Sequence, residues 1–353
     1  MNTDLMTYLN QGAQVLVRAI LKTAGLRYTL AFRRANKIRE RLARRGDKVP
    51  AFLIGSITTR CNLTCAGCYA QANQARTGKT KTELLPTARW GQLFREAAEC
   101  GISFILLAGG EPLMRIDVLE EAAKVKGILF PVFTNGTLLV GRGLELLNKH
   151  RNLIPMLSLE GGRNETDGRR SQGTYDALLG AMDRLNERQM FFGVSVTVTT
   201  ANLATVTSPE FHQRLHQKGC RAVLFVEYVP MTSDTESLAP TDAEREILDR
   251  EQTRLRLQYP DILYLSFPGD EKEAGGCLAA GRGFFHIGAD GSAEPCPFSP
   301  YSDINLRDHS LRQALASPLF GHLEGTGLLA SYHSGGCLLV QKEAEVKTFL
   351  GLD

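Results

Sequence analysis

Three cysteines lie close together near residue 65. Cys61, Cys65 and Cys68 are separated by three and by two residues, and Tyr69 follows directly. Three thiolates on one short loop can bind three irons of a [4Fe-4S] cluster, which leaves the fourth iron open to a small molecule. The alternative is a structural zinc site, but zinc usually takes four Cys or His ligands, and the thirty residues after Cys68 contain neither. The spacing therefore favours an iron-sulfur cluster.

A second candidate site is the turn Ala108-Gly109-Gly110-Glu111-Pro112, which follows an apolar run. Two glycines allow the backbone to approach a ligand without an intervening Cβ. A carboxylate directly after them can accept hydrogen bonds from an ammonium group. Alone, this turn is weak evidence for a binding site.

Together, the cysteine triad and this turn resemble the radical S-adenosylmethionine (SAM) superfamily. In that family the open iron binds the amino and carboxylate groups of SAM. The resemblance implies that Gly109, Gly110 and Glu111 bind the SAM amino group, and that Tyr69, the aromatic after the triad, contacts the cofactor.

Later segments extend the resemblance. Asn135 begins an Asn-Gly pair of the kind found after the third strand in many members, and Ser158 begins Ser-Leu-Glu-Gly where relatives usually have Ser-x-Asp-Gly. Asp167 to Arg170 resemble the Asp-x-x-Arg that follows. The resemblance implies that Asn135, Ser158 and Arg170 bind SAM, whereas Glu160 departs from the family pattern. Ordinary turns and caps are the alternative for Asn135 and Arg170.

Three further cysteines lie in the C-terminal part. Cys277 is followed by thirteen residues, Gly291, four residues and Cys296, and Cys337 comes later. This spacing resembles the start of the SPASM and Twitch extensions of radical SAM enzymes, although the later CxxC set of a full SPASM domain is missing. The resemblance implies a second, auxiliary [4Fe-4S] cluster whose fourth ligand is absent or not a cysteine. Candidates for that ligand are His286, His309, His333 and Asp303.

The elements that must position these residues alternate between strand and helix. Apolar, β-branched runs predict strands at 52–57, 104–107, 129–133, 154–159, 191–198 and 222–229. Helices are predicted near 83–99, 114–125, 138–149, 173–188, 207–218 and 241–258. Six strand-helix units predict a parallel sheet curled into a partial (β/α)6 TIM-like barrel, with ligands at the C-terminal strand ends. Core packing is predicted for Trp90, Cys100 and Cys220.

Three domains are predicted: a basic amphipathic helical arm over 1–50, the radical SAM partial barrel over 51–259, and a small auxiliary iron-sulfur domain over 260–353 that contains a hairpin with an Asp290-Gly291 turn. The arm has eleven basic and three acidic residues, whereas the whole chain carries a net charge of +3. Gln11, Gln14, Arg18 and Lys22 fall on one helical face and Leu16, Ile20 and Ala24 on the other. Such a helix suits an anionic membrane surface, a lipid substrate, or simple packing on the body.

The eight cysteines, with no secretory signal and no uncharged apolar run of eighteen residues, favour a reducing cytoplasm. The resemblance implies reductive cleavage of SAM to a 5′-deoxyadenosyl radical, hydrogen-atom abstraction from a peptide, tetrapyrrole or small metabolite, and a flavodoxin- or ferredoxin-type electron donor. A lipid-modifying enzyme with peripheral membrane contact is the alternative, and a non-catalytic iron-sulfur carrier or scaffold is the alternative of another class. The net acidic body argues against nucleic-acid binding.

Overall fold

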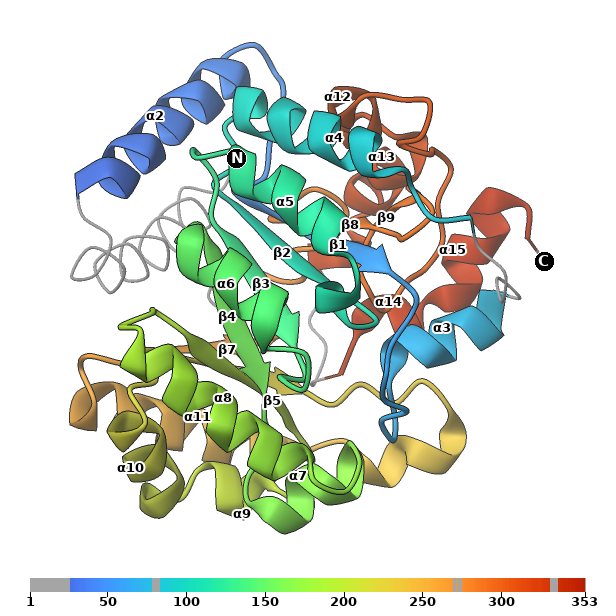
Figure 1. Cartoon of the computed structure of the whole chain (residues 1–353). Coiled ribbons are helices and arrows are strands. Elements are labelled where there is room, and N and C mark those ends of the chain that lie inside the picture. The colour runs from blue at the N-terminus through green and yellow to red at the C-terminus, as the bar shows by residue number, and fades with distance from the viewer. Residues whose placement is uncertain (1–25, 78–82, 269–270, 272–274, 331–335, 353) are drawn as a thin grey trace.

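The computed structural model describes residues 26–77, 83–268, 271, 275–330 and 336–352 (Figure 1). Its centre is a nine-stranded sheet in the order β7-β6-β5-β4-β3-β2-β1-β8-β9. Strands β1 to β7 pair in parallel, β8 pairs in parallel with β1, and β9 pairs antiparallel with β8. The strands are β1 Phe52–Thr58, β2 Phe104–Gly109, β3 Phe130–Thr134, β4 Leu153–Ser158, β5 Gly193–Val198, β6 Ala222–Glu227, β7 Leu263–Phe267, β8 His286–Ile287 and β9 Ala293–Glu294.

Helices connect the parallel strands and cover the outside of the curved sheet (Figure 1). In chain order they are α2 Leu26–Ala43, α3 Tyr69–Thr77, α4 Thr87–Cys100, α5 Ile116–Lys124, α6 Gly141–Lys149, α7 Arg163–Arg169, α8 Thr174–Glu187, α9 Leu203–Val206, α10 Pro209–Gln217 and α11 Asp242–Gln258. The C-terminal part adds α12 Leu311–Leu315, α13 Pro318–Gly325, α14 Leu338–Gln341 and α15 Glu343–Leu350. Short 3₁₀ helices lie at Pro112–Met114, Ser233–Leu238 and Leu328–Ala330.

The predicted partial barrel is confirmed, and all six predicted strands and the six predicted helices are present within a few residues. The sheet continues beyond the prediction, because β7 lies after residue 260 and still pairs with β6. The division into domains at residues 50 and 260 stays a prediction.

The core forms where the outer helices meet the sheet. Trp90 and Phe94 of α4 are almost fully buried, and Trp90 packs against Gly55 of β1. Cys100 and Cys220 are buried too, as the sequence predicts. Since the helices between the strands cover the outer face of the sheet, the inner face is left to line the inside of the barrel.

Helix α2 packs at the end of the barrel where the strands begin. Tyr28 and Phe32 join Phe104 in an apolar cluster there, with the rings of Phe32 and Phe104 4.8 Å apart. Arg39 donates a hydrogen bond to Ser103 Oγ at 3.0 Å, and burial lowers the pKa of Arg39 to about 10. The predicted faces of residues 11–24 lie outside the described residues. None of the helices in the described part of the chain has the length and apolar character that a membrane crossing requires.

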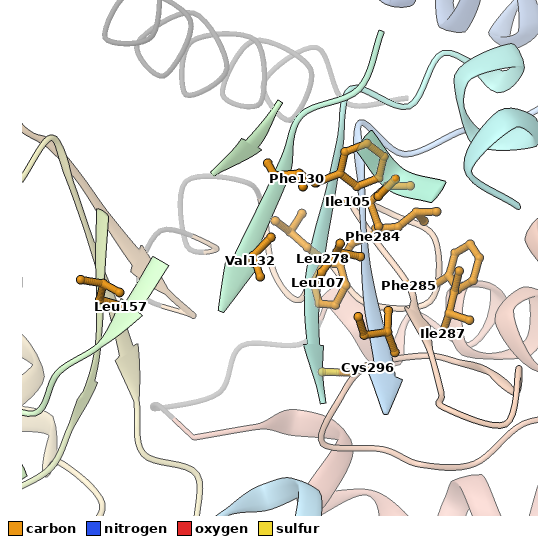
Figure 2. Close-up of a cluster of buried hydrophobic side chains, with 14 of the residues drawn as sticks. Ile105, Leu107, Phe130, Val132, Leu157, Leu278, Phe284, Phe285, Ile287 and Cys296 are labelled. Atoms are coloured by element: carbon orange, nitrogen blue, oxygen red, sulfur yellow. The ribbon is translucent and has the colours of Figure 1, made fainter. Parts of the chain in front are cut away.

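The C-terminal segment completes the other edge of the sheet. The predicted hairpin is present, because β8 and β9 pair across a turn in which Gly291 has a φ of +92°. Figure 2 shows Leu278, Phe284 and Cys296 from this segment in one buried cluster with Ile105 and Leu107 of β2. The segment that carries the later cysteines therefore packs directly on the barrel.

Candidate active site

A cavity of about 890 Å³ occupies the inside of the barrel. Where the strands begin, its lining is apolar and includes Phe52, Phe104, Ile154 and Leu263. Where the strands end, it contains every residue that the sequence assigns to SAM binding or to the first cluster: Cys61, Cys65, Cys68, Tyr69, Gly109, Gly110, Glu111, Asn135, Ser158 and Arg170. Residues as far apart in sequence as Cys61 and Arg170 thus meet at one end of the barrel, as the parallel topology requires.

The loop with the three cysteines has no regular structure and is held by neighbouring backbone. The Ala66 amide donates to the Arg169 carbonyl oxygen at 2.8 Å, and the Glu111 amide donates to the Arg60 carbonyl oxygen at 2.9 Å. Gly110 makes the second contact possible, because a Cβ there would overlap the Arg60 carbonyl group.

Gly67, between the second and third cysteines, has a φ of +63°, and a Cβ there would overlap the hydroxyl of Tyr228. Tyr228 follows β6 and also lines the cavity. This loop accordingly needs glycine on both steric and conformational grounds.

Positive charge stands beside the cysteine loop. Burial raises the pKa of Cys61 and Cys65, and at Cys65 the charges of Arg170 and Arg169 oppose this rise. Arg170 Nη1 lies 3.9 Å from Cys65 Sγ. A guanidinium at this distance favours the thiolate, which is the form that binds iron.

Glu111 is buried and accepts three hydrogen bonds. Oε1 accepts from Thr134 Oγ1 at 2.8 Å and from the Leu113 amide at 3.0 Å, and Oε2 accepts from the Asn135 amide at 2.9 Å. Burial raises the pKa of Glu111, and these hydrogen bonds act against the rise. Because two carboxylate oxygens offer about four acceptor positions, one position is left for a ligand in the cavity.

The side-chain amide of Asn135 has partners within the protein. It donates to Asn62 Oδ1 at 3.0 Å and accepts from the amide of Thr137 at 3.0 Å. Asn135 thus ties the cysteine loop to the end of β3. Ser158 lies at the end of β4 opposite Ser195 of β5, and both serines line the cavity.

Glu160, which departs from the family pattern, is the centre of a buried ion-pair network. Its Oε1 accepts from Arg169 Nη1 at 2.7 Å and from Arg170 Nε at 2.8 Å, and its Oε2 accepts from the Thr197 amide at 3.0 Å. Burial alone would raise the pKa of Glu160, but the charges of Arg170 and Arg169 hold it below the usual value. Glu160 therefore fixes both arginines on the side of the cavity that faces Cys65.

The three C-terminal cysteines come together outside the barrel cavity. Burial raises the pKa of Cys277 and Cys296 well above the usual value, and a hydrogen bond with Cys296 lowers the pKa of Cys337. Their neighbours Leu278 and Phe298 line the cavity. The second cysteine group thus lies just behind the cavity wall.

The sequence candidates for a fourth ligand have other partners in the described part of the chain. His286 contacts Ser56 and Glu294, His309 contacts the Asn305 carbonyl oxygen, and Asp303 accepts from the Leu319 amide. His333 lies outside the described residues.

Both cysteine groups fit iron-sulfur clusters in donor type and number. All eight cysteines are free thiols. Within the described ranges, no three His, Cys, Asp or Glu side chains converge closely enough to bind a single metal ion. A [4Fe-4S] cluster is wider than one ion and takes each thiolate on a different iron, so its ligands do not have to converge on one point.

Sequence reasoning missed several polar residues of the cavity wall. Arg169, Glu227, Tyr228 and Glu271 all line it. Glu227 of β6 is paired with Arg245 at 2.8 Å, and burial raises the pKa of Glu271 to about 7. Arg169 stands next to a predicted residue, but the other three have no local motif that would have identified them.

Comparison with known proteins decides between the alternatives. Residues 56–213 match the model of the Radical SAM superfamily. These residues therefore form a Radical SAM domain. An AdoMet-dependent heme synthase of Methanosarcina barkeri is 25% identical over 291 residues, which cover 75% of this chain and 81% of the relative. A PqqA peptide cyclase of Methylocella silvestris is 25% identical over 300 residues, which cover 78% and 77%.

The fold is shared with solved structures as well. The structure of Streptococcus suis SuiB bound to S-adenosylmethionine aligns with a TM-score of 0.70 and 18% identity, covering 88% of this chain and 78% of SuiB. The protein is therefore a radical SAM enzyme that uses a [4Fe-4S] cluster and SAM, and its relatives are of the SPASM/Twitch type, in which auxiliary clusters occur. The alternatives of a zinc site and a non-catalytic carrier are set aside.

Proposed function

We propose that this radical SAM enzyme abstracts a hydrogen atom from a substrate held in the barrel cavity, and that Cys61, Cys65 and Cys68 bind the cluster that activates SAM. The observation that carries the proposal is that all three cysteines and Glu111 line one end of a single cavity. When bound, the cluster and SAM supply a 5′-deoxyadenosyl radical, and the protein supplies orientation and exclusion of water.

The surrounding side chains have separate tasks in this proposal. Glu111 accepts a hydrogen bond from the SAM ammonium group with the acceptor position that its protein donors leave free. Arg170 stabilises negative charge at Cys65, from which its Nη1 is 3.9 Å away. Tyr69, Asn135 and Ser158 line the same end of the cavity and limit where SAM can lie.

Cys277, Cys296 and Cys337 are proposed to hold an auxiliary [4Fe-4S] cluster. Their mutual proximity and the burial of Cys277 and Cys296 support this assignment. A flavodoxin- or ferredoxin-type protein is the proposed electron donor, because SAM cleavage in this superfamily consumes an electron.

The cavity also bears on the substrate. Its inner half is lined by apolar side chains from six of the strands β1 to β7, including Leu106, Phe133, Met156, Leu224 and Leu265, whereas β5 contributes Ser195 and Thr197. Such a lining favours a substrate with a large apolar surface. The two relatives above are named for heme synthesis and for a peptide, so a tetrapyrrole or an apolar peptide segment is the proposed substrate class.

Deuterium transfer tests this proposal. Reconstituted enzyme is incubated anaerobically with SAM, reductant and deuterated tetrapyrrole or peptide candidates, and 5′-deoxyadenosine is analysed by mass spectrometry. Deuterium in 5′-deoxyadenosine identifies the substrate, and the Cys65→Ala variant serves as the control without an intact first site. Absence of 5′-deoxyadenosine from the wild-type enzyme would contradict the radical reaction. Its formation without deuterium would reject only the substrate class.

A lipid or membrane-bound substrate is the second candidate, and the exposed face of α2 favours it. The opposite face of α2 packs on the barrel through Tyr28, Ala35 and Leu42. The exposed face and the following turn carry six basic side chains with only Glu40 and Asp47 as acids: Arg33, Arg34, Lys37, Arg41, Arg44 and Arg45. Each Lys or Arg near an anionic leaflet contributes about 1 kcal/mol of attraction. The apolar end of the cavity lies beside this helix.

Vesicle binding tests the second candidate. Replacing Arg33, Arg34, Lys37 and Arg41 with glutamine is expected to weaken co-sedimentation with phosphatidylglycerol vesicles at low salt. The free energy of binding should fall by up to about 4 kcal/mol if all four side chains contact the membrane. The matched control replaces the exposed Lys124, Arg142, Lys149 and Arg151 with glutamine and so removes the same number of positive charges. Equal weakening by both sets would mean that net charge, and not this helix, attracts the membrane.

A further inference from the structure

A buried hydrogen-bonded chain connects the barrel to the C-terminal hairpin. Ser56 Oγ lies 2.7 Å from His286 Nε2, and His286 Nδ1 lies 2.7 Å from Glu294 Oε2. All three residues are less than a tenth exposed. Since a carboxylate only accepts, Nδ1 donates to Glu294 and leaves Nε2 to accept from the Ser56 hydroxyl.

This chain lies between the two cysteine groups. Ser56 belongs to β1, which leads into Cys61, and Glu294 belongs to β9, two residues before Cys296. The backbone pairing between β1 and β8 spans only two residue pairs, Ile54 with His286 and Gly55 with Ile287. Because so short a ladder has little stability of its own, side-chain contacts must hold the hairpin in place.

The segments that carry Cys68 and Cys296 also touch each other. The rings of Tyr69 and Phe298 meet edge to face with centroids 5.4 Å apart, and Asn73 Nδ2 donates to the Pro297 carbonyl oxygen at 2.7 Å. Tyr69, Ser56, His286 and Glu294 surround a second cavity of about 80 Å³.

We propose that His286 is a positioning residue that fixes the spacing between the two clusters, by holding the Cys296 segment against the Cys68–Tyr69 turn through Glu294 and Ser56. This inference rests on the proposed cluster ligands. Neither nitrogen of His286 is free to bind iron, because each faces a buried partner. The residue therefore acts on the geometry between the cysteine groups and not as a ligand.

Two variants of His286 separate hydrogen bonding from bulk. His286→Leu removes both hydrogen bonds, whereas the amide of His286→Gln can donate to Glu294 and accept from Ser56. His212→Leu is the matched control, because His212 is equally buried and contacts the Val206 carbonyl oxygen and Tyr264 on another side of the barrel. Ser56→Ala is a milder variant that removes only the hydroxyl, for use if His286→Leu does not fold.

The measurement is electron paramagnetic resonance of the full-length, anaerobically reconstituted and dithionite-reduced proteins, with iron and sulfide determined on the same samples. We expect spin-spin interaction between the two reduced clusters in the wild type, a loss or change of it in His286→Leu and Ser56→Ala, and retention in His286→Gln and His212→Leu. Iron and sulfide are expected to stay at the wild-type amount in all variants.

Three results would overturn the inference: no interaction in the wild type, the same interaction in wild type and His286→Leu, or equal changes in His286→Leu and His212→Leu. Failure of the cluster assignments is distinguishable, because it appears as an iron content below two clusters in the wild type. In that case the proposed ligands, and not the positioning role, are at fault.

Discussion

Replacing Glu160 with glutamine tests whether its buried charge stabilises the protein beside the cysteine loop. Glu160 is 1% exposed and bonds both Arg169 and Arg170. Removing one partner of a buried ion pair costs about 3 to 5 kcal/mol. The side chains of Arg169 and Arg170 are 18% and 11% exposed, so water offsets part of that cost. We expect Glu160→Gln to lower the free energy of unfolding by about 3 kcal/mol at pH 7.

The assay is denaturant unfolding of the cluster-free protein. Asp176→Asn is the matched control, because Asp176 forms a two-bond ion pair with Arg163 at the surface, where the side chains are 61% and 50% exposed. An exposed pair contributes little to stability, because water and salt screen it. If Glu160→Gln loses no more stability than Asp176→Asn, the buried network does not stabilise the fold as argued.

The pH dependence gives an independent check. Burial would raise the pKa of Glu160, but Arg170 and Arg169 hold it below its ordinary value of 4.5. A carboxylate with a lowered folded pKa contributes stability above its unfolded pKa, and this contribution is lost as the pH falls through the folded pKa. The difference between wild type and Glu160→Gln should therefore be largest at neutral pH and shrink below about pH 4.5. A constant difference would refute the electrostatic origin.

Four further predictions follow from the same geometry. Replacing Cys61, Cys65 and Cys68 together with alanine should lower iron from about eight to about four per chain; an unchanged count would exclude these ligands. Gly110→Ala should displace the Arg60 carbonyl group and reduce iron at the first site, with Gly127→Ala, where a Cβ meets nothing within 4 Å, as the control. Glu111→Gln should weaken SAM binding tenfold to a hundredfold, or about 1.5 to 3 kcal/mol, in calorimetry of protein with intact iron content. Burial lowers the pKa of His212 to about 4, so the unfolded protein binds this proton more readily than the folded protein. The wild type should therefore lose up to about 3 kcal/mol of stability as the pH falls from 6.5 to 4. The His212→Leu variant should not show this loss.

Local motifs explain why so much of the site was predictable. The cysteine triad and the Gly109-Gly110-Glu111 turn each follow a strand, and the parallel topology alone brings the ends of β1 and β2 together. The strands themselves were predictable from apolar, β-branched runs. Helix α3 was not, because its sequence is mostly polar and it contains no buried residue.

Features that depend on distant segments were not predictable. The Ser56–His286 contact joins residues 230 apart, and no local pattern marks either as a partner of the other. Glu160 departs from the family pattern. The fold brings Arg169 and Arg170, at the end of α7, to its carboxylate, and no local pattern predicts this pairing. Strand β7 was missed because it is short and lies just before a segment rich in Gly and Pro.

The cysteine loop is irregular, and contacts from three directions determine its position. Asn135 holds it through Asn62 at the end of β3, and Arg169 holds it through the Ala66 amide. On the third side, helix α3 continues from Cys68 and is fixed to the C-terminal segment by the bond between Asn73 and Pro297. The protein thus positions its first cysteine group partly through the segment that carries the second, so the geometry of either group depends on the folding of both.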